Sequence, residues 1–459
     1  MLLMRITTLT SLLLALPIAC CAQTLAPTPP MGWNSWDSYG ATINERQFRE
    51  SAAWVAAHLK PAGYEYVTID AEWFVAEPTA SGNQANAHRM MDATGRYIPE
   101  PTRFPSAAGG AGFAPLGDYI HSLGLKFGIH VLQGIPKDAV AAKLPVEGSR
   151  FNAQDAANVA AGCSWKPDND DLQTSEAGQA YYDSIVRLYA SWHVDLIKID
   201  CIASRPYKGD EVRMFHEAIV KSGRPMVLSL SPGEAPLDEA GNLQTYAQQW
   251  RISDDEWDVW HSATAYPQGL NDQFPRAARW IAAQSSNAGG GHWPDADMLA
   301  VGRLGPAPGY GKARDTRLTH DEQRALMNLW CIFRSPLMYG GDPAATDEWT
   351  LSLLTNPEVI GVDQHSSHNR SALLTDALAI WTADAEGATH DRFVAVFNRL
   401  DTPQTIHQEW VGLGLDAGTY SSRDLWTHET KEGRRALDVT LPAHGSTLLR
   451  LSGGAAVKR

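Results

Sequence analysis

The chain has 459 residues, of which 44% are hydrophobic and 20% charged, so it is long enough for one large domain and a smaller one with ordinary globular cores. Its formal net charge of −14 at pH 7 argues against a nucleic-acid partner and against an anionic membrane surface. Its 16 tryptophans supply aromatic faces that suit sugar rings, although most large aromatic residues serve a core.

The N-terminus has the pattern of a secretory leader. Arg5 supplies a positive start, and residues 12–18 form an apolar stretch that small residues suited to cleavage follow. This stretch is too short for a convincing membrane span. A lipoprotein cut before Cys20 is the weaker alternative, because Pro17 fits poorly three places earlier. We therefore expect residues 1–22 to be a signal peptide and the mature protein to be secreted or periplasmic.

Short apolar runs alternate with helical patterns between about residues 26 and 345, which indicates βα units and a parallel sheet. Helices are predicted at 45–59 and 178–192, where apolar residues recur at helical spacing. Several of the apolar runs are nearly continuous, as expected of strands buried on both faces. We predict an α/β fold with a (β/α)₈ TIM barrel over residues 23–365. Its eight strands are predicted at 31–36, 64–70, 125–130, 195–200, 225–231, 250–255, 292–297 and 335–340.

The pattern changes after about residue 365. Short strands at 393–398, 422–426 and 446–450 are separated by turn residues, in the manner of an antiparallel sandwich. No pair of acids and no histidine cluster stands out in this part of the sequence. We predict an accessory C-terminal β-sandwich domain over residues 366–455. It either binds polysaccharide or only braces the barrel, and bracing is the favoured interpretation.

Carboxylates mark the ends of two predicted barrel strands, at Asp200 and at Asp254-Asp255. Barrel enzymes carry their catalytic groups at these C-terminal ends, and a nucleophile together with an acid/base carboxyl is the equipment of a retaining glycosidase. Lys198 lies two residues before Asp200, on the same side of the strand, so we expect it to pair with Asp200 and keep it ionised. One of the two adjacent acids is expected to face the site. The alternatives are a purely structural ion pair at Lys198–Asp200 and a helix cap at Asp254-Asp255.

A metal site is a different interpretation, since His130, His292, Asp200 and Asp295 all lie near predicted strand ends. The sequence lacks the paired-histidine motifs of zinc hydrolases, and it also lacks a nucleophile elbow, a Walker loop and a dinucleotide fingerprint. We therefore expect neither a catalytic metal nor a cofactor.

Three cysteines remain, Cys163, Cys201 and Cys331, if Cys20 and Cys21 leave with the leader. Export permits a disulfide, and an odd number of cysteines permits at most one. A Cys163–Cys201 bridge beside Asp200 is one interpretation, and three buried free thiols are the other.

Long ordered motifs at residues 28–36 (TPPMGWNSW), 293–299 (WPDADML), 334–338 (RSPLM) and 441–446 (LPAHGS) resemble those of glycoside hydrolase family 27, which contains α-galactosidases and α-N-acetylgalactosaminidases. The resemblance extends over nearly the whole mature chain. It implies a (β/α)₈ barrel followed by an antiparallel β-sandwich. It also implies a retaining double displacement without a metal.

The resemblance further implies roles for individual residues. Asp200 corresponds to the nucleophile of the Lys-x-Asp motif, and Asp255 to the acid/base, four residues after Arg251. Arg251 would then reach the 2-hydroxyl of the sugar and Lys198 its 3- and 4-hydroxyls. Trp36 would lie against the apolar face of the ring.

The sequence departs from the family pattern in the expected sugar pocket. Family α-galactosidases have two consecutive carboxylates after the second strand, which hold the 4- and 6-hydroxyls. Here Asp70 is followed by Ala71, and Glu72 is displaced by one residue, where a regular strand would put it on the same side as Asp70. His130 stands where tyrosine is frequent, and Ser231 ends the strand from which many members contact the 2-substituent. These departures concern the sugar that is bound and leave the reaction class intact.

From these observations we predict a secreted retaining exo-glycosidase that hydrolyses terminal α-D-galactosyl residues of an oligosaccharide or polysaccharide. The alternatives keep the same residues but change the sugar, to a β-L-arabinopyranoside, an α-N-acetylgalactosaminide or an isomalto-type α-glucan. A transglycosylase would also use the same residues, because loop shape decides whether water is excluded. A non-catalytic sugar-binding barrel is the alternative from another functional class.

Overall fold

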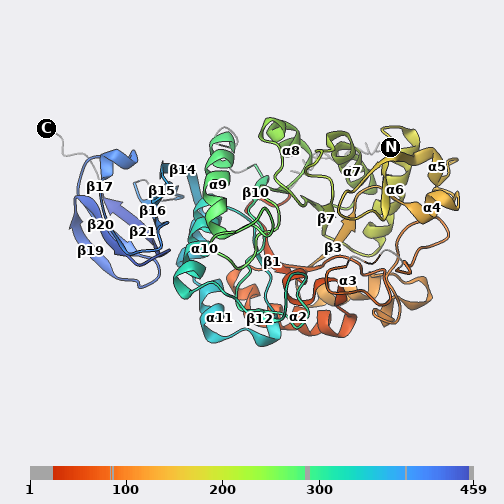
Figure 1. Ribbon diagram of the computed structural model, residues 1–459, viewed down its shortest axis with the longest axis horizontal. Helices are drawn as coiled ribbons and strands as arrows, with labels where there is room; N and C mark the ends of the chain where they lie inside the picture. Colours follow the sequence, from red (N-terminus) through yellow and green to blue (C-terminus); the bar gives the residue numbers. More distant parts are fainter. Residues whose placement is uncertain (1–23, 83, 85–86, 285–289, 388–389, 454–459) are drawn as a thin grey trace, which may run out of the picture.

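Eight parallel strands form the central sheet of the N-terminal part, in the spatial order β10-β9-β8-β7-β3-β2-β1-β13 (Figure 1). The structure is a computed structural model that describes residues 24–82, 84, 87–284, 290–387 and 390–453, so the predicted signal peptide lies outside the described residues. The strands are β1 (Met31–Asn34), β2 (Tyr66–Ile69), β3 (Lys126–Leu132), β7 (Leu196–Asp200), β8 (Val227–Leu230), β9 (Gln249–Arg251), β10 (Trp293–Asp295) and β13 (Leu337–Tyr339). All eight predicted strands are confirmed, although the sixth ends at Arg251.

The sheet curls until its two edge strands approach each other. The segment that follows β10 forms a parallel bridge between Leu299 and Tyr339 of β13, and Leu299 N donates a hydrogen bond to Met338 O at 2.7 Å. The predicted barrel architecture is therefore confirmed. The C-terminal ends of all eight strands meet at one end of the barrel.

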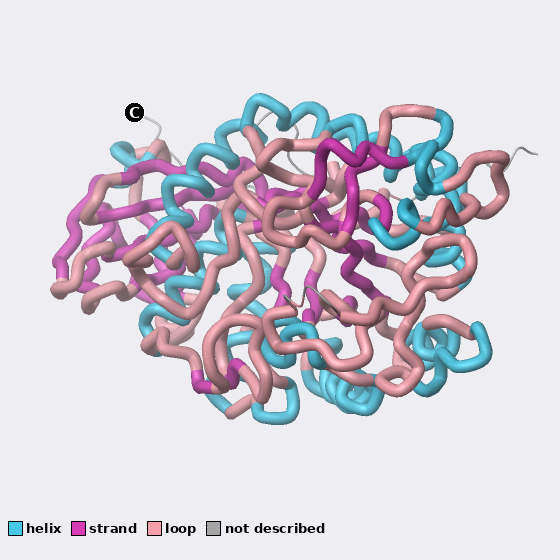
Figure 2. The backbone as a smooth tube through the Cα atoms, turned by 45° about the vertical axis from the view of Figure 1, so that its right-hand side comes forward, coloured by secondary structure: helices cyan, strands magenta, loops and turns pink. Residues whose placement is uncertain are grey.

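Helices cover the outside of the curled sheet, and long loops cross one end of it (Figure 2). The predicted helices at 45–59 and 178–192 are confirmed by α2 and α6. A capping box at Asn44 and Gln47 begins α2, whose Phe48 and Val55 are buried against the barrel. The helices of this part are α1 (Trp36–Tyr39), α2 (Glu45–His58), α3 (Ala114–Ser122), α6 (Glu176–Ser191), α7 (Gly209–Ser222), α8 (Ala240–Tyr246), α9 (Leu270–Gln284), α10 (His320–Phe333), α11 (Glu348–Leu354) and α12 (Pro357–Gln364).

The segment between β3 and α6 has secondary structure of its own. It contains the small sheet β4-β6-β5 and two short helices. A disulfide joins Cys163 in this segment to Cys201, directly after β7, with the two Cα atoms 5.7 Å apart. The chain around residues 163–168 is thereby held beside the barrel mouth. These elements are β4 (Ile135–Pro136), α4 (Lys137–Ala141), α5 (Ala153–Ala156), β5 (Ala157–Gly162) and β6 (Asn169–Leu172), and a second small hairpin consists of β11 (Arg303–Leu304) and β12 (Arg314–Asp315).

The C-terminal part is an antiparallel sandwich, as predicted, that packs beside α9 and α10 (Figure 1). Phe274 of α9 meets Phe397 edge to face at 5.0 Å between ring centroids, and Asn328 of α10 donates a hydrogen bond to Ser446 Oγ at 2.9 Å. Its six-stranded sheet has β14 (Ser366–Leu374), β15 (Leu378–Ala385), β16 (Arg392–Asn398), β21 (Ser446–Gly453), β18 (Tyr420–Asp424) and β19 (Thr430–Arg434), and its second sheet has β17 (Gln404–Glu409) and β20 (Ala436–Leu441).

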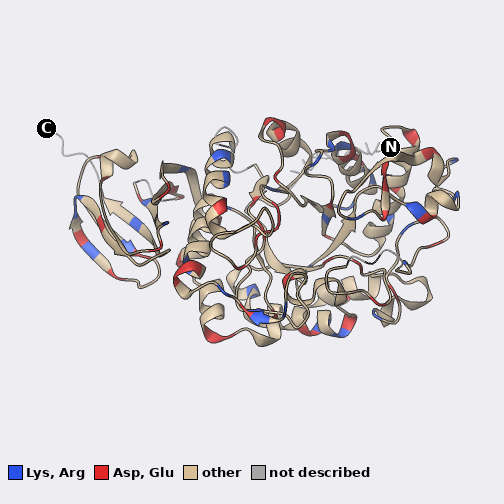
Figure 3. Ribbon diagram, viewed as in Figure 1, with Lys and Arg blue, Asp and Glu red and all other residues tan. Residues whose placement is uncertain are grey.

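Acidic and basic residues are interspersed over both domains rather than separated into faces (Figure 3). In the described part of the chain, every helix is too short or too polar to cross a membrane.

A buried arginine ties together the loops that follow the first two strands. Arg103 is 9% exposed, and its guanidinium donates to the carbonyl oxygens of Ala41, Ile43, Glu72 and Val75 at 2.6–2.7 Å. Burial lowers the pKa of Arg103 to about 10, which still leaves it charged at neutral pH. One side chain therefore fixes two walls of the barrel mouth relative to each other.

Replacing Arg103 by Met is expected to lower the free energy of unfolding by at least about 3 kcal/mol, because it leaves four buried carbonyl groups without their donor. Urea unfolding measures this change. Arg46→Met, on the exposed face of α2, is the matched control and should stay within about 0.5 kcal/mol of the unmodified protein. Equal effects of the two substitutions would refute the role given to Arg103.

Candidate active site

A cavity of about 530 Å³ opens at the C-terminal ends of the barrel strands. This volume lies in the range of small-molecule sites, and the position is the one where barrel enzymes carry their chemistry. All nine residues to which the sequence assigned a catalytic or sugar-binding role contribute to its lining, whereas His292 and Asp295 of the metal interpretation do not: the nine are Trp36, Asp70, Glu72, His130, Lys198, Asp200, Ser231, Arg251 and Asp255. Tertiary structure thus brings together groups that are up to 219 positions apart, the separation between residues 36 and 255.

Asp200 ends β7 and presents its carboxylate to the cavity. Its Oδ2 lies 3.2 Å from His130 Nε2, whereas its buried Oδ1 has no hydrogen-bond partner among the described residues. The following residue, Cys201, has φ +68° and forms the disulfide to Cys163. One oxygen of Asp200 is therefore uncommitted, on a backbone that is held on both sides.

Lys198 pairs with Asp70 and not with Asp200, which corrects the expectation from the sequence. Lys198 Nζ donates to Asp70 Oδ2 at 2.8 Å, and Asn34 donates to the same oxygen at 2.8 Å. The long lysine side chain reaches past β3, which lies between β7 and β2 in the sheet, to the carboxylate that follows β2.

The contact between Asp70 and Lys198 favours the charged form of both groups. Burial alone would raise the pKa of Asp70, but the Lys198 ammonium, His130 and the hydrogen bonds from Lys198 and Asn34 hold that pKa below its usual value. Burial acts to lower the pKa of Lys198, and the Asp70 carboxylate overrides it and raises that pKa. The cavity wall therefore carries a fixed anion and a fixed cation in contact with each other.

Asp254 and Asp255 both line the cavity, whereas only one of them was expected to face it. The reason is that β9 ends at Arg251, so the alternation of side chains along a strand no longer applies at residues 254 and 255. Asp254 forms a bidentate ion pair with Arg205, at 2.5 and 2.8 Å. Asp255 has looser contacts, 3.4 Å to Arg251 and 3.4 Å to Tyr266 Oη, and its side chain is 30% exposed.

Glu72 reaches the cavity by a different route from the one expected. The strand β2 ends at Ile69 and Glu72 has φ +62°, so regular strand geometry does not place it. Its buried carboxylate forms an ion pair with Lys166, which the disulfide-linked segment carries to this wall of the cavity. Burial raises the pKa of Glu72 although the Lys166 ammonium acts to lower it. No local pattern pointed to Lys166 as the partner of Glu72, because the two residues are 94 positions apart.

His130, Trp36 and Ser231 occupy three further parts of the wall. The backbone oxygen of His130 accepts a hydrogen bond from Trp73 Nε1 at 2.7 Å, which fixes the end of β3. The ring of Trp36 lies against Gly309, where a side chain would clash with it. Ser231 is 3% exposed, and its backbone N–H donates to Ile199 O at 2.9 Å, so its hydroxyl is held at the end of β8.

Three buried acids of the cavity wall had no role assigned to them from the sequence. Asp297 forms an ion pair with Arg251 and accepts a hydrogen bond from the backbone N–H of Glu256 at 2.8 Å. Glu256 is 2% exposed, and neither of its carboxyl oxygens has a partner within the described chain. Burial, followed by the charges of Asp297 and Asp37, raises the pKa of Glu256 well above its usual value. Burial and the charge of Asp297 do the same to Asp37.

Aromatic residues outside the sequence prediction complete the cavity. Trp165, Tyr266 and Tyr310 line it, and the guanidinium of Arg205 lies 5.2 Å from the Trp165 ring. Tyr266 and Tyr310 meet edge to face at 5.6 Å between ring centroids. Such flat apolar surfaces beside charged groups suit a sugar, whose ring has apolar faces and a polar rim.

Replacing Glu256 by Gln is expected to make the free energy of unfolding less dependent on pH. The folded protein keeps this carboxyl protonated above its usual pKa of 4.5, whereas the unfolded chain ionises it there. The unmodified protein therefore loses stability as pH rises between these two pKa values, by up to about 1.4 kcal/mol per pH unit. Urea unfolding at about pH 5 and pH 7 detects the difference. Glu50→Gln on the exposed face of α2 should keep the slope of the unmodified protein, and the same slope in Glu256→Gln would contradict the assignment.

Comparison with known proteins agrees with this arrangement. The family model described as alpha galactosidase A matches residues 28–166 and 173–365, and the model of the alpha galactosidase C-terminal beta sandwich domain matches residues 375–451. An alpha-galactosidase from Cyamopsis tetragonoloba is 31% identical over 416 residues, which cover 89% of this chain and 82% of that protein.

Two solved structures are more similar in sequence. A family 27 β-L-arabinopyranosidase from Geobacillus stearothermophilus, solved in complex with arabinose, is 42% identical with a TM-score of 0.88, covering 93% of this chain and 98% of that one. A putative alpha-N-acetylgalactosaminidase from Bacillus halodurans is 40% identical with a TM-score of 0.80, covering 92% and 97%. The matched models and these similarities extend over both domains, and the chain belongs to glycoside hydrolase family 27.

Proposed function

We propose that this protein is a retaining exo-glycosidase that hydrolyses terminal α-D-galactosyl residues, with Asp200 as nucleophile and Asp255 as acid/base. The observation that carries the proposal is the contrast between the two carboxylates in one cavity. Asp200 is held at its backbone and keeps one buried oxygen uncommitted, whereas Asp255 is partly exposed and loosely held. A nucleophile needs an oxygen in a fixed orientation towards the carbon that it attacks. An acid/base needs access first to the leaving group and then to water.

The reaction would proceed in two displacements. Asp200 attacks the anomeric carbon and forms an ester bond to it while the glycosidic C–O bond breaks, and Asp255 donates its proton to the departing oxygen. Water then attacks the same carbon, Asp255 takes its proton, and Asp200 leaves as a carboxylate. Lys198 and Arg251 stay charged throughout and hold the hydroxyls of the sugar.

The Asp70–Lys198 pair favours a sugar with the galacto configuration. A hydroxyl can accept a hydrogen bond from the Lys198 ammonium while it donates one to the Asp70 carboxylate. Both groups are largely buried in the cavity wall. A bound sugar that displaces water from them without forming these hydrogen bonds would leave the two charges less well solvated. The axial 4-hydroxyl, which distinguishes galactose from glucose, is the group that this arrangement would select.

A second candidate substrate is a β-L-arabinopyranoside, and Ala71 is the observation that favours it. This sugar has the same ring configuration as an α-D-galactoside but lacks the exocyclic hydroxymethyl group. Ala71 lines the cavity and supplies no side-chain acceptor for a 6-hydroxyl. The 42% identity to an arabinopyranosidase is consistent with a pocket that gains little from that group.

We also propose that the protein is exported. The predicted leader motivates this proposal, and the Cys163–Cys201 disulfide supports it, because such bonds persist mainly in oxidising compartments.

Replacing Asp200 by Ala is expected to abolish hydrolysis of p-nitrophenyl α-D-galactoside, by at least about 10⁴-fold in kcat, because the covalent intermediate can no longer form. Added azide should restore release of p-nitrophenol and yield the β-glycosyl azide, which NMR identifies. Asp254→Ala is the matched control, since it removes a neighbouring carboxylate that forms an ion pair with Arg205. Full activity in Asp200→Ala, or an equal loss in both variants, would exclude Asp200 as the nucleophile.

Replacing Ala71 by Asp is expected to raise kcat/KM for the α-galactoside relative to the β-L-arabinopyranoside by about 10-fold or more, since a hydrogen bond to a charged group contributes about 1.5–3 kcal/mol. Steady-state kinetics on the two p-nitrophenyl glycosides gives the ratio. Ala71→Ser is the control for added volume, because its hydroxyl is uncharged. A ratio that does not change in Ala71→Asp would mean that this wall does not contact the exocyclic group.

A further inference from the structure

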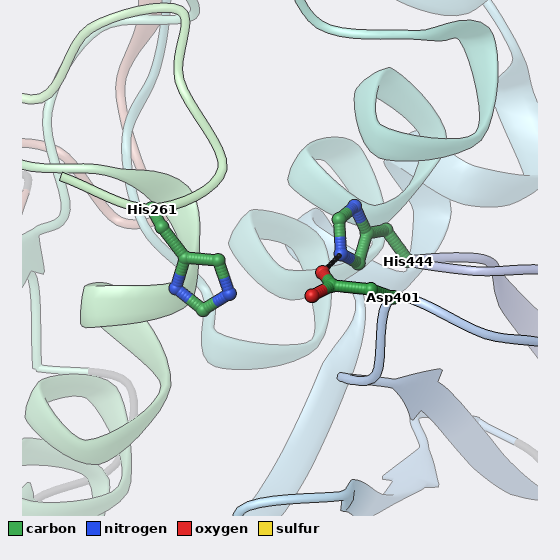
Figure 4. Close-up of side chains that lie close together, drawn as sticks. All are labelled: His261, Asp401 and His444. Atoms are coloured by element: carbon green, nitrogen blue, oxygen red, sulfur yellow. Dashed lines mark hydrogen bonds and ion pairs between the residues drawn. The ribbon is translucent and has the colours of Figure 1, made fainter. Parts of the chain in front are cut away.

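Three metal-ligating side chains meet at the junction between the barrel and the sandwich, away from the cavity lining (Figure 4). His261 lies in the segment between β9 and α9, Asp401 follows β16, and His444 precedes β21. One ligand atom from each lies within 4.8 Å of the other two. We propose that this cluster binds a divalent transition-metal ion of the Zn²⁺ class, which bridges the two domains.

His444 is oriented as a metal ligand requires. Its Nδ1 lies 2.7 Å from Glu322 Oε1, and its Nε2 lies 2.8 Å from Asp401 Oδ1. Trp260 stacks on the imidazole with 4.2 Å between ring centroids, so the plane of the ring is fixed as well. The Glu322 carboxylate holds a proton at Nδ1, an arrangement common behind zinc-binding histidines, and a bound metal would take the place of the proton that Nε2 shares with Asp401.

His261 approaches the same point from the barrel side. Figure 4 shows its Nε2 directed towards Asp401. Its other nitrogen, Nδ1, lies 3.4 Å from the Asn271 side chain, away from the cluster. The rings of His261 and His444 are 6.2 Å apart and nearly perpendicular, at 82°, so their nitrogens converge without the rings colliding.

Two imidazole nitrogens and one carboxylate are a donor set that Zn²⁺ and its neighbours in the first transition series prefer. Zn–N bonds of about 2.0–2.1 Å put tetrahedral ligand atoms about 3.4 Å apart. The ligand atoms lie within 4.8 Å of one another and need only a small closure, and the exposed positions of His261 and Asp401 give their side chains room to move. Their exposure also leaves room for water as a further ligand.

The proposed ion would join parts that otherwise meet through side-chain packing and hydrogen bonds. His261 belongs to the segment that follows Asp255 and includes Tyr266, whereas Asp401 and His444 belong to the sandwich. Binding would therefore stabilise the docked arrangement of the domains. The chemistry proposed for the cavity does not depend on it.

The test is titration of EDTA-treated, dialysed full-length mature protein with Zn²⁺ by calorimetry, together with its melting temperature. We expect one Zn²⁺ per chain and a higher Tm with Zn²⁺. His261→Ala should weaken binding by more than about 100-fold. Glu322→Gln should weaken it by about 10–100-fold, the usual cost of losing a group that orients a ligand. His407→Ala, a change of an exposed histidine of the sandwich outside the cluster, should bind like the unmodified protein.

Cobalt substitution gives a second readout, since Co²⁺ bound through these nitrogens would show visible absorption that His261→Ala loses. Circular dichroism confirms that each variant is folded, and His261→Gln replaces His261→Ala if the latter is not. Absence of Zn²⁺ binding by the unmodified protein would overturn the proposal. Binding that His261→Ala and His261→Gln leave unchanged, or that His407→Ala weakens equally, would overturn it as well.

Discussion

The cavity depends on two buried cations that are each matched by a buried carboxylate. Lys198 of β7 pairs with Asp70, which follows β2. Arg251 at the end of β9 pairs with Asp297, which follows β10. Removing one member of such a pair leaves a buried charge that nothing neutralises, which typically costs several kcal/mol. The closed arrangement of strands is what brings the partners together, so the fold and the charge balance of the site support each other.

The other acids of the site divide according to their surroundings. Glu256 and Asp37 are buried without enough partners, and their raised pKa values favour the neutral form. Asp254 forms an ion pair with Arg205. Asp200 keeps one oxygen without a hydrogen-bond partner among the described residues, and Asp255 has only long contacts. In a cavity with this many carboxyl groups, the partners of each one decide which can react. The proposed double displacement uses the two that are left available.

The contacts that join the two domains differ from the buried ion pairs of the cavity. Packing at Phe274–Phe397 and hydrogen bonds at Asn328 join them over a buried surface, whereas the proposed metal cluster lies at an exposed edge of the same junction. An ion there would act on docking, and the sugar chemistry would stay with the barrel. The sandwich would in that case be braced by a polar link as well as by apolar contact.

The sequence by itself determined the eight strands, the sandwich strands and the family, because strand periodicity and long motifs are local properties of the chain. It also identified nine residues that line the cavity, since residues at strand ends converge in any barrel. Only the tertiary structure decided the partners: Lys198 with Asp70, Glu72 with Lys166, and Asp254 beside Asp255 in one cavity. The tertiary structure also chose the Cys163–Cys201 disulfide, one of the two interpretations of the sequence, over three free thiols, and only there did the His261 cluster appear. Contacts between residues dozens to hundreds of positions apart depend on how strands and loops are arranged in space. Local sequence patterns do not show which of these distant residues come into contact.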